Sequence, residues 1–303
     1  MKTRLQMLKQ KIIETYLFNY ISAQLHFIKR RRELKKIVGS LIDKYRMKPM
    51  EEENLNCEIS DYVWVCWWQG ENDMSPIVRK CYDQIKELNT NKQVILITEE
   101  NVNKYVTFPS FIIEKYHKGI ITKTHLSDIL RTELLCKYGG VWMDITLITW
   151  TRIPDSFFEF PFYTGHFAYD KYDFNISRNR WTSFFLVARN PNNVLFQYLA
   201  DFWRLYWRQK DCLIEYFLID YAIDFGYKYI STIRKEIDLV PINGCGNNVW
   251  QLLKILPNQF KDEVIEKIKK ENWMQKLSYR GENKIQEKSN SPENSIYKKL
   301  FLD

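Results

Sequence analysis

Hydrophobic and polar positions change their period several times along the chain, and each change marks an expected element. Short runs of β-branched and aromatic residues predict strands over residues 61–68, 93–98 and 141–148, with further candidates over 157–166 and 181–188. Apolar residues three and four positions apart predict helices over residues 75–88, 110–118, 125–138, 192–208 and 212–225, with more helix between 248 and 270. This order of strands and helices predicts one α/β domain from about residue 55 to 303, built on a mixed, mostly parallel central sheet.

The first 50 residues have a different pattern. Apolar residues between 4 and 28 follow a helical period, a run of four basic residues follows at 29–32, and the apolar pattern then continues to Leu41. Residues 1–50 contain 13 Lys or Arg and three acidic residues, so this segment accounts for more than the whole net charge of +8. We therefore expect a basic amphipathic helical extension, followed by a linker at 47–54.

This extension has three interpretations. It can pack on the main domain with a solvated basic face, it can bind an anionic lipid surface, where each basic residue contributes ~1 kcal/mol, or it can act as a nucleic-acid arm. The rest of the chain carries a slight negative charge. Nucleic-acid binding is therefore not expected as the principal activity, because a nucleic-acid-binding domain carries its own basic face.

Composition narrows the class of protein. Hydrophobic residues make up 45% and charged residues 27%, as in soluble globular proteins, and aromatic residues reach 16%, which fits a large core or a cleft for flat rings. The six cysteines form no CxxC pair, so no zinc ribbon or haem attachment is expected, and their scatter favours a reducing, cytoplasmic compartment. The sequence contains no run of the ~20 apolar residues that span a bilayer and no signal-peptide pattern, so neither a transmembrane helix nor a signal peptide is expected.

The most informative chemistry lies between residues 127 and 146. Asp128 and Arg131 are three residues apart on an expected helix and share a face of it. Gly139 and Gly140 end that helix and allow a tight turn into a strand that carries Asp144. Two acids and an Arg are thus expected to converge at one edge of the sheet. Taken alone, Asp128 and Arg131 are equally explained by a surface ion pair worth ~0.3–0.5 kcal/mol.

The expected sheet also predicts where a ligand binds. In open parallel sheets, ligands bind beyond the carboxyl ends of the strands, so residues 67–75 and 98–101 are expected to line a cleft. Carboxylates there accept hydrogen bonds from sugar hydroxyls or hold a divalent cation, which neutralises a leaving diphosphate. An Arg or Lys adds donors for phosphate oxygens. This is the set of side chains that a nucleotide-sugar transferase needs.

Residues 127–146, together with the opening run at 63–70, resemble the DxD-containing sugar transferases of the GT-A type. The resemblance is to the capsular polysaccharide synthesis protein family, to glycosyltransferase family 32 and to the glucosyltransferase domains of the large clostridial toxins. It covers roughly residues 55–280 and implies a GT-A-like nucleotide-sugar-binding domain.

The resemblance implies a role for each matching residue. Trp64 would stack on the nucleotide base, although core packing explains it equally well, and Ser127 would lie near the nucleoside. Asp128 and Arg131 would hold the hydroxyls of the donor sugar. Asp144 is the first acid of the DxD motif and would contact the ribose, the sugar or a metal.

The third position of that motif is Thr146 and not a second acid. A threonine hydroxyl is a neutral and weaker metal ligand. Either a divalent Mn²⁺ or Mg²⁺ is held at Asp144 and Thr146 with help from water and the diphosphate, or metal dependence is reduced.

Near the C-terminal end of the chain, Lys276, with Trp273 and Arg280, would supply phosphate contacts as a lid or would form a surface turn.

Two further features of the sequence each allow two interpretations. Asp220 is either a satisfied buried acid or a carboxylate of the catalytic site. The Gly- and Asn-rich residues 243–248 form either a mobile loop that closes over the diphosphate or a plain loop.

The expected function is transfer of a sugar from a nucleotide-sugar, with UDP the expected nucleotide, to a hydroxyl of a capsular or other cell-surface polysaccharide. The acceptor would be a glycan or a lipid-linked saccharide, reached by peripheral contact of residues 1–50 with the inner face of the cell membrane. The resemblance implies retention of anomeric configuration. The alternative, motivated by Thr146, is a non-catalytic nucleotide-sugar-binding subunit of a polysaccharide assembly.

Overall fold

The computed structural model describes residues 4–46, 59–169, 174–282, 284–285 and 292–303, with side chains described from residue 18 onward. The predicted linker at 47–54 lies outside the described residues. The domain boundaries at 50 and 55 therefore stay predictions.

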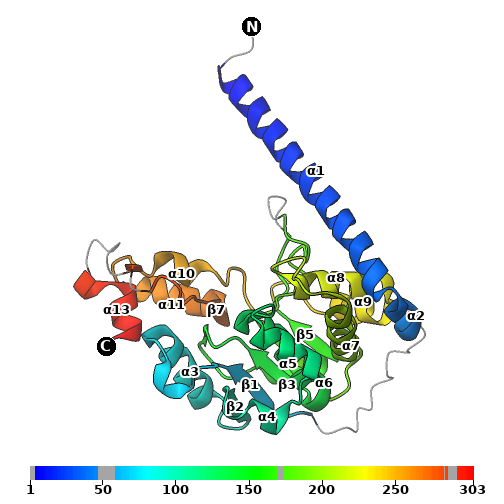
Figure 1. The fold of residues 1–303 in the computed structure, drawn as a ribbon. Coiled ribbons are helices and arrows are strands. Elements are labelled where there is room, and N and C mark those ends of the chain that lie inside the picture. The colour runs from blue at the N-terminus through cyan, green and yellow to red at the C-terminus, as the bar shows by residue number, and fades with distance from the viewer. Residues whose placement is uncertain (1–3, 47–58, 170–173, 283, 286–291) are drawn as a thin grey trace.

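A five-stranded mixed sheet forms the centre of the molecule, in the order β2-β1-β3-β6-β5 (Figure 1). Its strands are β1 (Tyr62–Cys66), β2 (Gln93–Ile97), β3 (Gly140–Met143), β5 (Phe162–Thr164) and β6 (Phe185–Ala188). The first three strands are parallel to one another, and the last two are antiparallel to their neighbours. The predicted α/β class with a mixed central sheet is confirmed, and the arrangement is consistent with the GT-A-like fold that the resemblance implies.

Helices cover the sheet and fill the space around it. The helices after β1 are α3 (Pro76–Leu88), α4 (Val102–Tyr105), α5 (Ser110–His117), α6 (Lys123–Tyr138), α7 (Val194–Gln209), α8 (Leu218–Tyr229), α9 (Ser231–Asp238), α10 (Gln251–Ile255), α11 (Asp262–Glu271) and α13 (Ile296–Phe301). Short 3-10 turns lie at Glu71–Asp73, Asp155–Glu159 and Pro292–Asn294. Helix α6 packs against β1, β3 and β6 on one side and against α7 on the other, which explains why nine of its side chains are buried.

The predicted strand over residues 141–148 is wrong as a single element. The chain leaves the central sheet after Met143, and Leu147 N–H bonds back to the carbonyl of Asp144 at 2.9 Å, which closes a turn. It then enters a separate two-stranded sheet as β4 (Leu147–Thr149), antiparallel to β7 (Met274–Lys276). This second sheet, with α3, α10, α11 and α13, contributes to a second, smaller apolar core.

Other boundaries also differ from the sequence prediction. The strand expected over residues 157–166 is a 3-10 turn followed by the short β5, and the helix expected from 212 begins at Leu218. The hydroxyl of Tyr206 accepts from Ile214 N–H and donates to the carbonyl of Cys212, so this segment is held as a loop against α7. Helix α9 and strand β7 were not expected from the sequence.

The expected N-terminal helix is confirmed as α1 (Arg4–Val38), followed by α2 (Ser40–Arg46). Its C-terminal half packs on α7 and α8 and contributes Phe27, Leu34 and Val38 to the main core. Its first half projects away from the body of the molecule (Figure 1). Within the part of the chain that the structure describes, none of the helices is both long enough and apolar enough to cross a bilayer.

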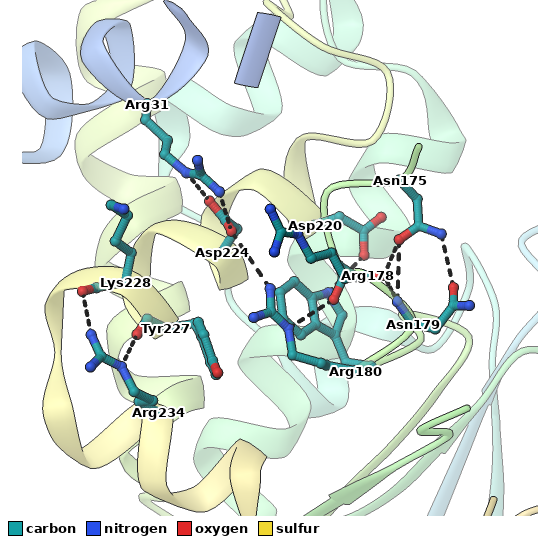
Figure 2. A network of polar contacts seen from close by, with 12 residues as sticks. Arg31, Asn175, Arg178, Asn179, Arg180, Asp220, Asp224, Tyr227, Lys228 and Arg234 are labelled. Atoms are coloured by element: carbon teal, nitrogen blue, oxygen red, sulfur yellow. Dashed lines mark hydrogen bonds and ion pairs between the residues drawn. The ribbon is translucent and has the colours of Figure 1, made fainter. Parts of the chain in front are cut away.

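An ion-pair network fixes α1 to α8 (Figure 2). Arg31 donates two hydrogen bonds to the carboxylate of Asp224, at 2.6 and 2.8 Å, and Asp224 is 2% exposed. Arg180 approaches the same carboxylate at 3.9 Å and stacks on the ring of Tyr227, 4.0 Å from its centroid. Two cations thus compensate one buried acid, which makes this pairing suitable for fixing the position of α1.

Candidate functional site

A cavity of about 400 Å³ opens where β1 and β3 end, between the central sheet and the two-stranded sheet. It is lined by residues at the ends of β1, β3 and β7 and just beyond them, by residues of α6, and by residues on and beside α10: Cys66, Trp67, Trp68, Gln69, Lys123, Thr124, Ser127, Arg131, Trp142, Asp144, Ile145, Thr146, Trp250, Leu253, Lys276, Leu277, Ser278, Tyr279 and Arg280. A ligand site beyond the carboxyl ends of parallel strands is the position that the topology favours.

Helix α6 supplies one wall of the cavity. Its first turn is capped by the hydroxyl of Thr122, which accepts from His125 N–H. One turn later the hydroxyl of Ser127 accepts from the indole N–H of Trp68 at 2.8 Å and donates to the carbonyl of Lys123 at 2.9 Å. Ser127 therefore lines the cavity as predicted and also fixes the orientation of Trp68.

The predicted convergence of Asp128, Arg131 and Asp144 is confirmed. Arg131 Nη2 lies 3.2 Å from Asp128 Oδ1 and 3.5 Å from Asp144 Oδ1. Its guanidinium also stacks on Trp142, 4.9 Å from the ring centroid, and donates to the carbonyl of Ser183. Arg131 is 6% exposed, so the alternative interpretation as a surface ion pair is wrong.

Asp128 lies behind the cavity wall and not on it. Its second oxygen, Oδ2, is 3.4 Å from His125 Nδ1. Because His125 Nε2 accepts from the indole N–H of Trp207 at 3.2 Å, the proton of a neutral imidazole lies on Nδ1 and faces Asp128. Asp128 is thereby held between His125 and Arg131, where it orients the guanidinium that reaches the cavity.

Asp144 is the acid that reaches the cavity itself. Its Oδ1 accepts from the indole N–H of Trp142 at 3.0 Å, and its Oδ2 lies 3.1 Å from Lys276 Nζ. Burial favours the neutral carboxyl, but the positive charges of Lys276 and Arg131 outweigh it and hold the pKa of Asp144 below its ordinary value. Asp144 is therefore ionised at neutral pH.

The entry into β3 requires a glycine. Gly140 has φ +91°, and a Cβ there would lie 2.3 Å from the carbonyl oxygen of Tyr62 on β1. Only glycine allows the two backbones to approach this closely. The close contact places β3, and Asp144 at its end, directly beside β1.

Trp64 does not lie at the cavity, where its expected role of stacking on the nucleotide base would require it to be. Its side chain is 0% exposed, and its indole N–H donates to the carbonyl of Gly139 at 2.9 Å. It packs among Tyr62, Tyr105 and Tyr138 and is absent from the cavity wall. A strand of a parallel sheet is covered on both faces, so its central tryptophan belongs to the core.

The aromatic residue in the right place is Trp67, just beyond β1. Its partly exposed ring lines the cavity and meets Tyr279 edge to face at a centroid distance of 5.1 Å. The prediction that residues 67–75 line a cleft is confirmed for 67–69, whereas residues 70–75 are not part of the cavity wall. Residues 98–101 do not line the cavity, although Glu99 forms a 2.5 Å ion pair with Lys123, which does.

Two of the three residues predicted to supply phosphate contacts late in the chain lie at the cavity, and one does not. Lys276 and Arg280 line the cavity, whereas Trp273 is held outside it by a hydrogen bond to the carbonyl of Arg152 and by packing on Phe157. Residues 243–248 are also outside the wall. Sequence reasoning missed the role of Trp142, whose position at the end of β3 beside Asp144 was the available signal.

Asp220, for which the sequence left two interpretations open, lies at the start of α8 near this site. Its carboxyl accepts from the indole N–H of Trp181 at 3.0 Å, beside the segment that carries Arg178 and Arg180 (Figure 2). Burial raises the pKa of Asp220 to about 7, and the charge of Asp128 adds to this effect. Asp220 is thus a carboxyl that changes charge near neutral pH.

The raised pKa of Asp220 predicts that the stability of the protein depends on pH. The folded protein keeps the proton of Asp220 until about pH 7, whereas the unfolded chain loses it near pH 4. The free energy of unfolding should therefore fall as pH rises from about 4 to 7. We expect Asp220→Asn to remove about 1–3 kcal/mol of the decrease between pH 5 and 8, as measured by denaturant unfolding. Asp155→Asn, at an exposed position, should leave the slope unchanged, and equal slopes in the Asp220 variant and the parent would contradict the assignment.

The residues implied for a divalent cation do not form a typical site for one. Asp144 supplies one carboxylate, Thr146 supplies a neutral hydroxyl, and Lys276 contacts both side chains. Among the described residues, no group of three or more His, Cys, Asp or Glu side chains is arranged to hold a metal ion. Mg²⁺ and Mn²⁺ favour several oxygen ligands with carboxylates among them. The use of a metal stays a prediction, which this donor set does not favour.

Three comparisons with known proteins show what this chain is similar to. The family model for capsular polysaccharide synthesis proteins matches residues 11–300. The O-glycosyltransferase braB of Annulohypoxylon truncatum is 29% identical over 110 residues, which cover 31% of this chain and about a quarter (26%) of that relative. A solved structure titled PaToxG Glycosyltransferase covers 71% of this chain and 83% of its own, at 14% identity and a TM-score of 0.37. Because the family model spans nearly the whole sequence, the chain belongs to the capsular polysaccharide synthesis protein family.

Proposed function

We propose that the protein is a glycosyltransferase that moves a sugar from a nucleoside-diphosphate sugar to a hydroxyl of a surface glycan. The charge of the cavity is the observation that carries this proposal. Among the described residues that line it are four cations, Lys123, Arg131, Lys276 and Arg280, against the single carboxylate of Asp144. Aromatic rings on the same wall can stack on a base. A cavity with surplus positive charge and flat rings suits a nucleotide diphosphate.

The transfer breaks the bond between the anomeric carbon and the diphosphate and forms one between that carbon and the acceptor oxygen. The diphosphate leaves with the electron pair of the broken bond, and the proton of the acceptor hydroxyl passes to a phosphate oxygen of the leaving diphosphate. Arg131 and Lys276 would stabilise the negative charge that develops on the diphosphate, and Asp144 keeps both cations in place. Retention of configuration is implied by the resemblance and stays a prediction.

The family supports the proposed class of acceptor, and the resemblance supports the proposed nucleotide of the donor. Its description as capsular polysaccharide synthesis supports a capsular or other cell-surface polysaccharide acceptor, free or lipid-linked. UDP is the nucleotide that the resemblance implies. The second candidate, a non-catalytic nucleotide-sugar-binding subunit, is motivated by Thr146 at the position of the second acid.

A donor panel separates these two candidates. The purified chain is incubated with UDP- and GDP-sugars, with and without a polysaccharide acceptor, and nucleotide release is measured. The glycosyltransferase proposal expects slow release from one donor that accelerates with acceptor. Nucleotide binding without turnover of any donor would favour the binding subunit instead.

Trp67 provides a separate prediction about base stacking. Because its ring lies on the cavity wall next to Tyr279, Trp67→Ala should weaken nucleotide binding by about 1–3 kcal/mol, as measured by calorimetric titration with UDP. Trp64→Phe is the matched control and should lower stability without changing affinity. An equal loss of affinity in the Trp64 variant would restore the original interpretation of that residue.

The exposed face of α1 supports the expected contact with a membrane. Phe18, Ile21, Leu25 and Ile28 are all at least 42% exposed. At about 100° per residue they form one stripe on the side of α1 opposite Phe27 and Leu34, which are buried. The exposed basic residues after position 28 continue the same face. Apolar residues followed by cations on one face suit the surface of an anionic bilayer.

We therefore expect the chain to sediment with vesicles that contain anionic lipid and much less with neutral vesicles. Leu25→Glu should reduce this binding several-fold, because it places a negative charge in the middle of the stripe. Dimerisation of the chain in solution through this face, without vesicle binding, would contradict the membrane interpretation. The cytoplasmic location stays a prediction.

A further inference from the structure

We propose that the ammonium group of Lys276 replaces the divalent cation of the DxD motif, so that this protein binds the diphosphate of its donor without a metal. The inference rests on the proposed function and specifies how the same cavity neutralises the diphosphate. It follows one of the two alternatives that Thr146 leaves open.

The backbone fixes Lys276 beside the motif. In the two-stranded sheet Lys276 pairs with Leu147, and the next residue, Leu277, donates its N–H to the carbonyl of Thr146 at 2.9 Å. The N–H of Lys276 itself donates to the carbonyl of Val249 at 2.7 Å. The short strand β7 is therefore held on both sides, and its lysine is positioned by main-chain hydrogen bonds and not by a flexible loop.

The side chain then occupies the place where a motif-bound cation would lie. Lys276 Nζ is 3.1 Å from Asp144 Oδ2 and also donates to the hydroxyl of Thr146. A metal ion bound by both these side chains would lie between the same two oxygens. Two cations cannot share that position, so the ammonium and a divalent ion exclude each other.

The charges around Asp144 also disfavour a divalent ion. The other oxygen of Asp144 already accepts from Trp142 and faces Arg131 at 3.5 Å. One carboxylate is thus shared by two side-chain cations, and Thr146 adds no negative charge. A divalent ion would meet net positive charge here, whereas a diphosphate would meet Lys276, Arg131 and the nearby Arg280.

Calorimetric titration with UDP and with GDP, each in EDTA and in Mn²⁺, tests the inference without any measurement of turnover. We expect at least one nucleotide to bind the parent protein in EDTA with an affinity within about twofold of that in Mn²⁺. Lys276→Met should weaken this binding about 10- to 100-fold, while Lys276→Arg should retain most of it. Lys254→Met is the control, because Lys254 is an exposed lysine on α10 beside the cavity residue Leu253.

A double variant makes the test reciprocal. Thr146→Asp combined with Lys276→Met restores a second acid and removes the ammonium, so nucleotide binding should become dependent on Mn²⁺. Nucleotide binding by the parent protein only in Mn²⁺ would overturn the inference and leave the proposed function standing. Failure of both nucleotides to bind under either condition would overturn both.

Discussion

Replacing Asp144 by Asn is expected to lower the rate of nucleotide release from the donor by about 100- to 1000-fold. The carboxylate of Asp144 holds Lys276 at 3.1 Å and Arg131 at 3.5 Å. An amide of the same shape keeps the hydrogen bond from Trp142 but loses the charge that fixes both cations toward the cavity. The rate is measured with the donor identified in the panel, at saturating concentration, so that the effect on turnover is separated from the effect on binding.

Asp155→Asn is the matched control for this variant. Asp155 forms an exposed pair with Arg152 at 2.7 Å, on the far side of β4 from the turn that holds Asp144. It should leave both turnover and the free energy of unfolding unchanged, because exposed ion pairs contribute little. Turnover in the Asp144 variant within threefold of the parent value would contradict the assigned role.

Replacing Arg131 by Met is expected to have the largest effect on stability, about 3–5 kcal/mol of the free energy of unfolding. The guanidinium is almost fully buried and compensates two carboxylates, Asp128 and Asp144. Without it, Asp128 loses its arginine partner and keeps the contact with His125 at 3.4 Å. A buried acid without its cation is costly, and denaturant unfolding near neutral pH measures the loss.

Arg131→Lys separates charge from geometry. The lysine keeps the positive charge but cannot form the fork that reaches two carboxylates and the carbonyl of Ser183 together. We expect an intermediate loss of stability and weaker donor binding. Arg152→Met removes an arginine from an exposed pair and should cost less than about 1 kcal/mol. An equally small cost at Arg131 would show that its carboxylate contacts do not stabilise the fold.

Local sequence patterns were sufficient to predict those elements whose formation depends mainly on residues close together in the sequence. The period of apolar residues on α6 and the glycines that end it fix both the helix and the strand that follows. This is why the convergence of Asp128, Arg131 and Asp144 was predictable. The parallel pairing of β1 and β2 was predicted from the strand–helix–strand order with its short connections.

The missed features depend on contacts between distant segments. The break after Met143 exists because β4 pairs with β7, about 130 residues later in the sequence, and nothing in the apolar run 141–148 signals that partner. Trp64 lies in the middle of β1 and Trp67 just beyond its end, and only the burial of β1 on both faces separates the core residue from the cavity residue. The contact of Lys276 with Thr146 depends on the same long-range pairing.

Photoaffinity labelling tests most directly whether an activated sugar binds where these segments meet. The full chain is irradiated with a 5-azido-uridine diphosphate sugar, digested, and the modified peptide is identified by mass spectrometry. The label should attach to the peptide that contains Trp67 or to the one that contains Tyr279, and excess UDP should prevent it. Protectable labelling that maps only to segments away from the cavity would contradict the account.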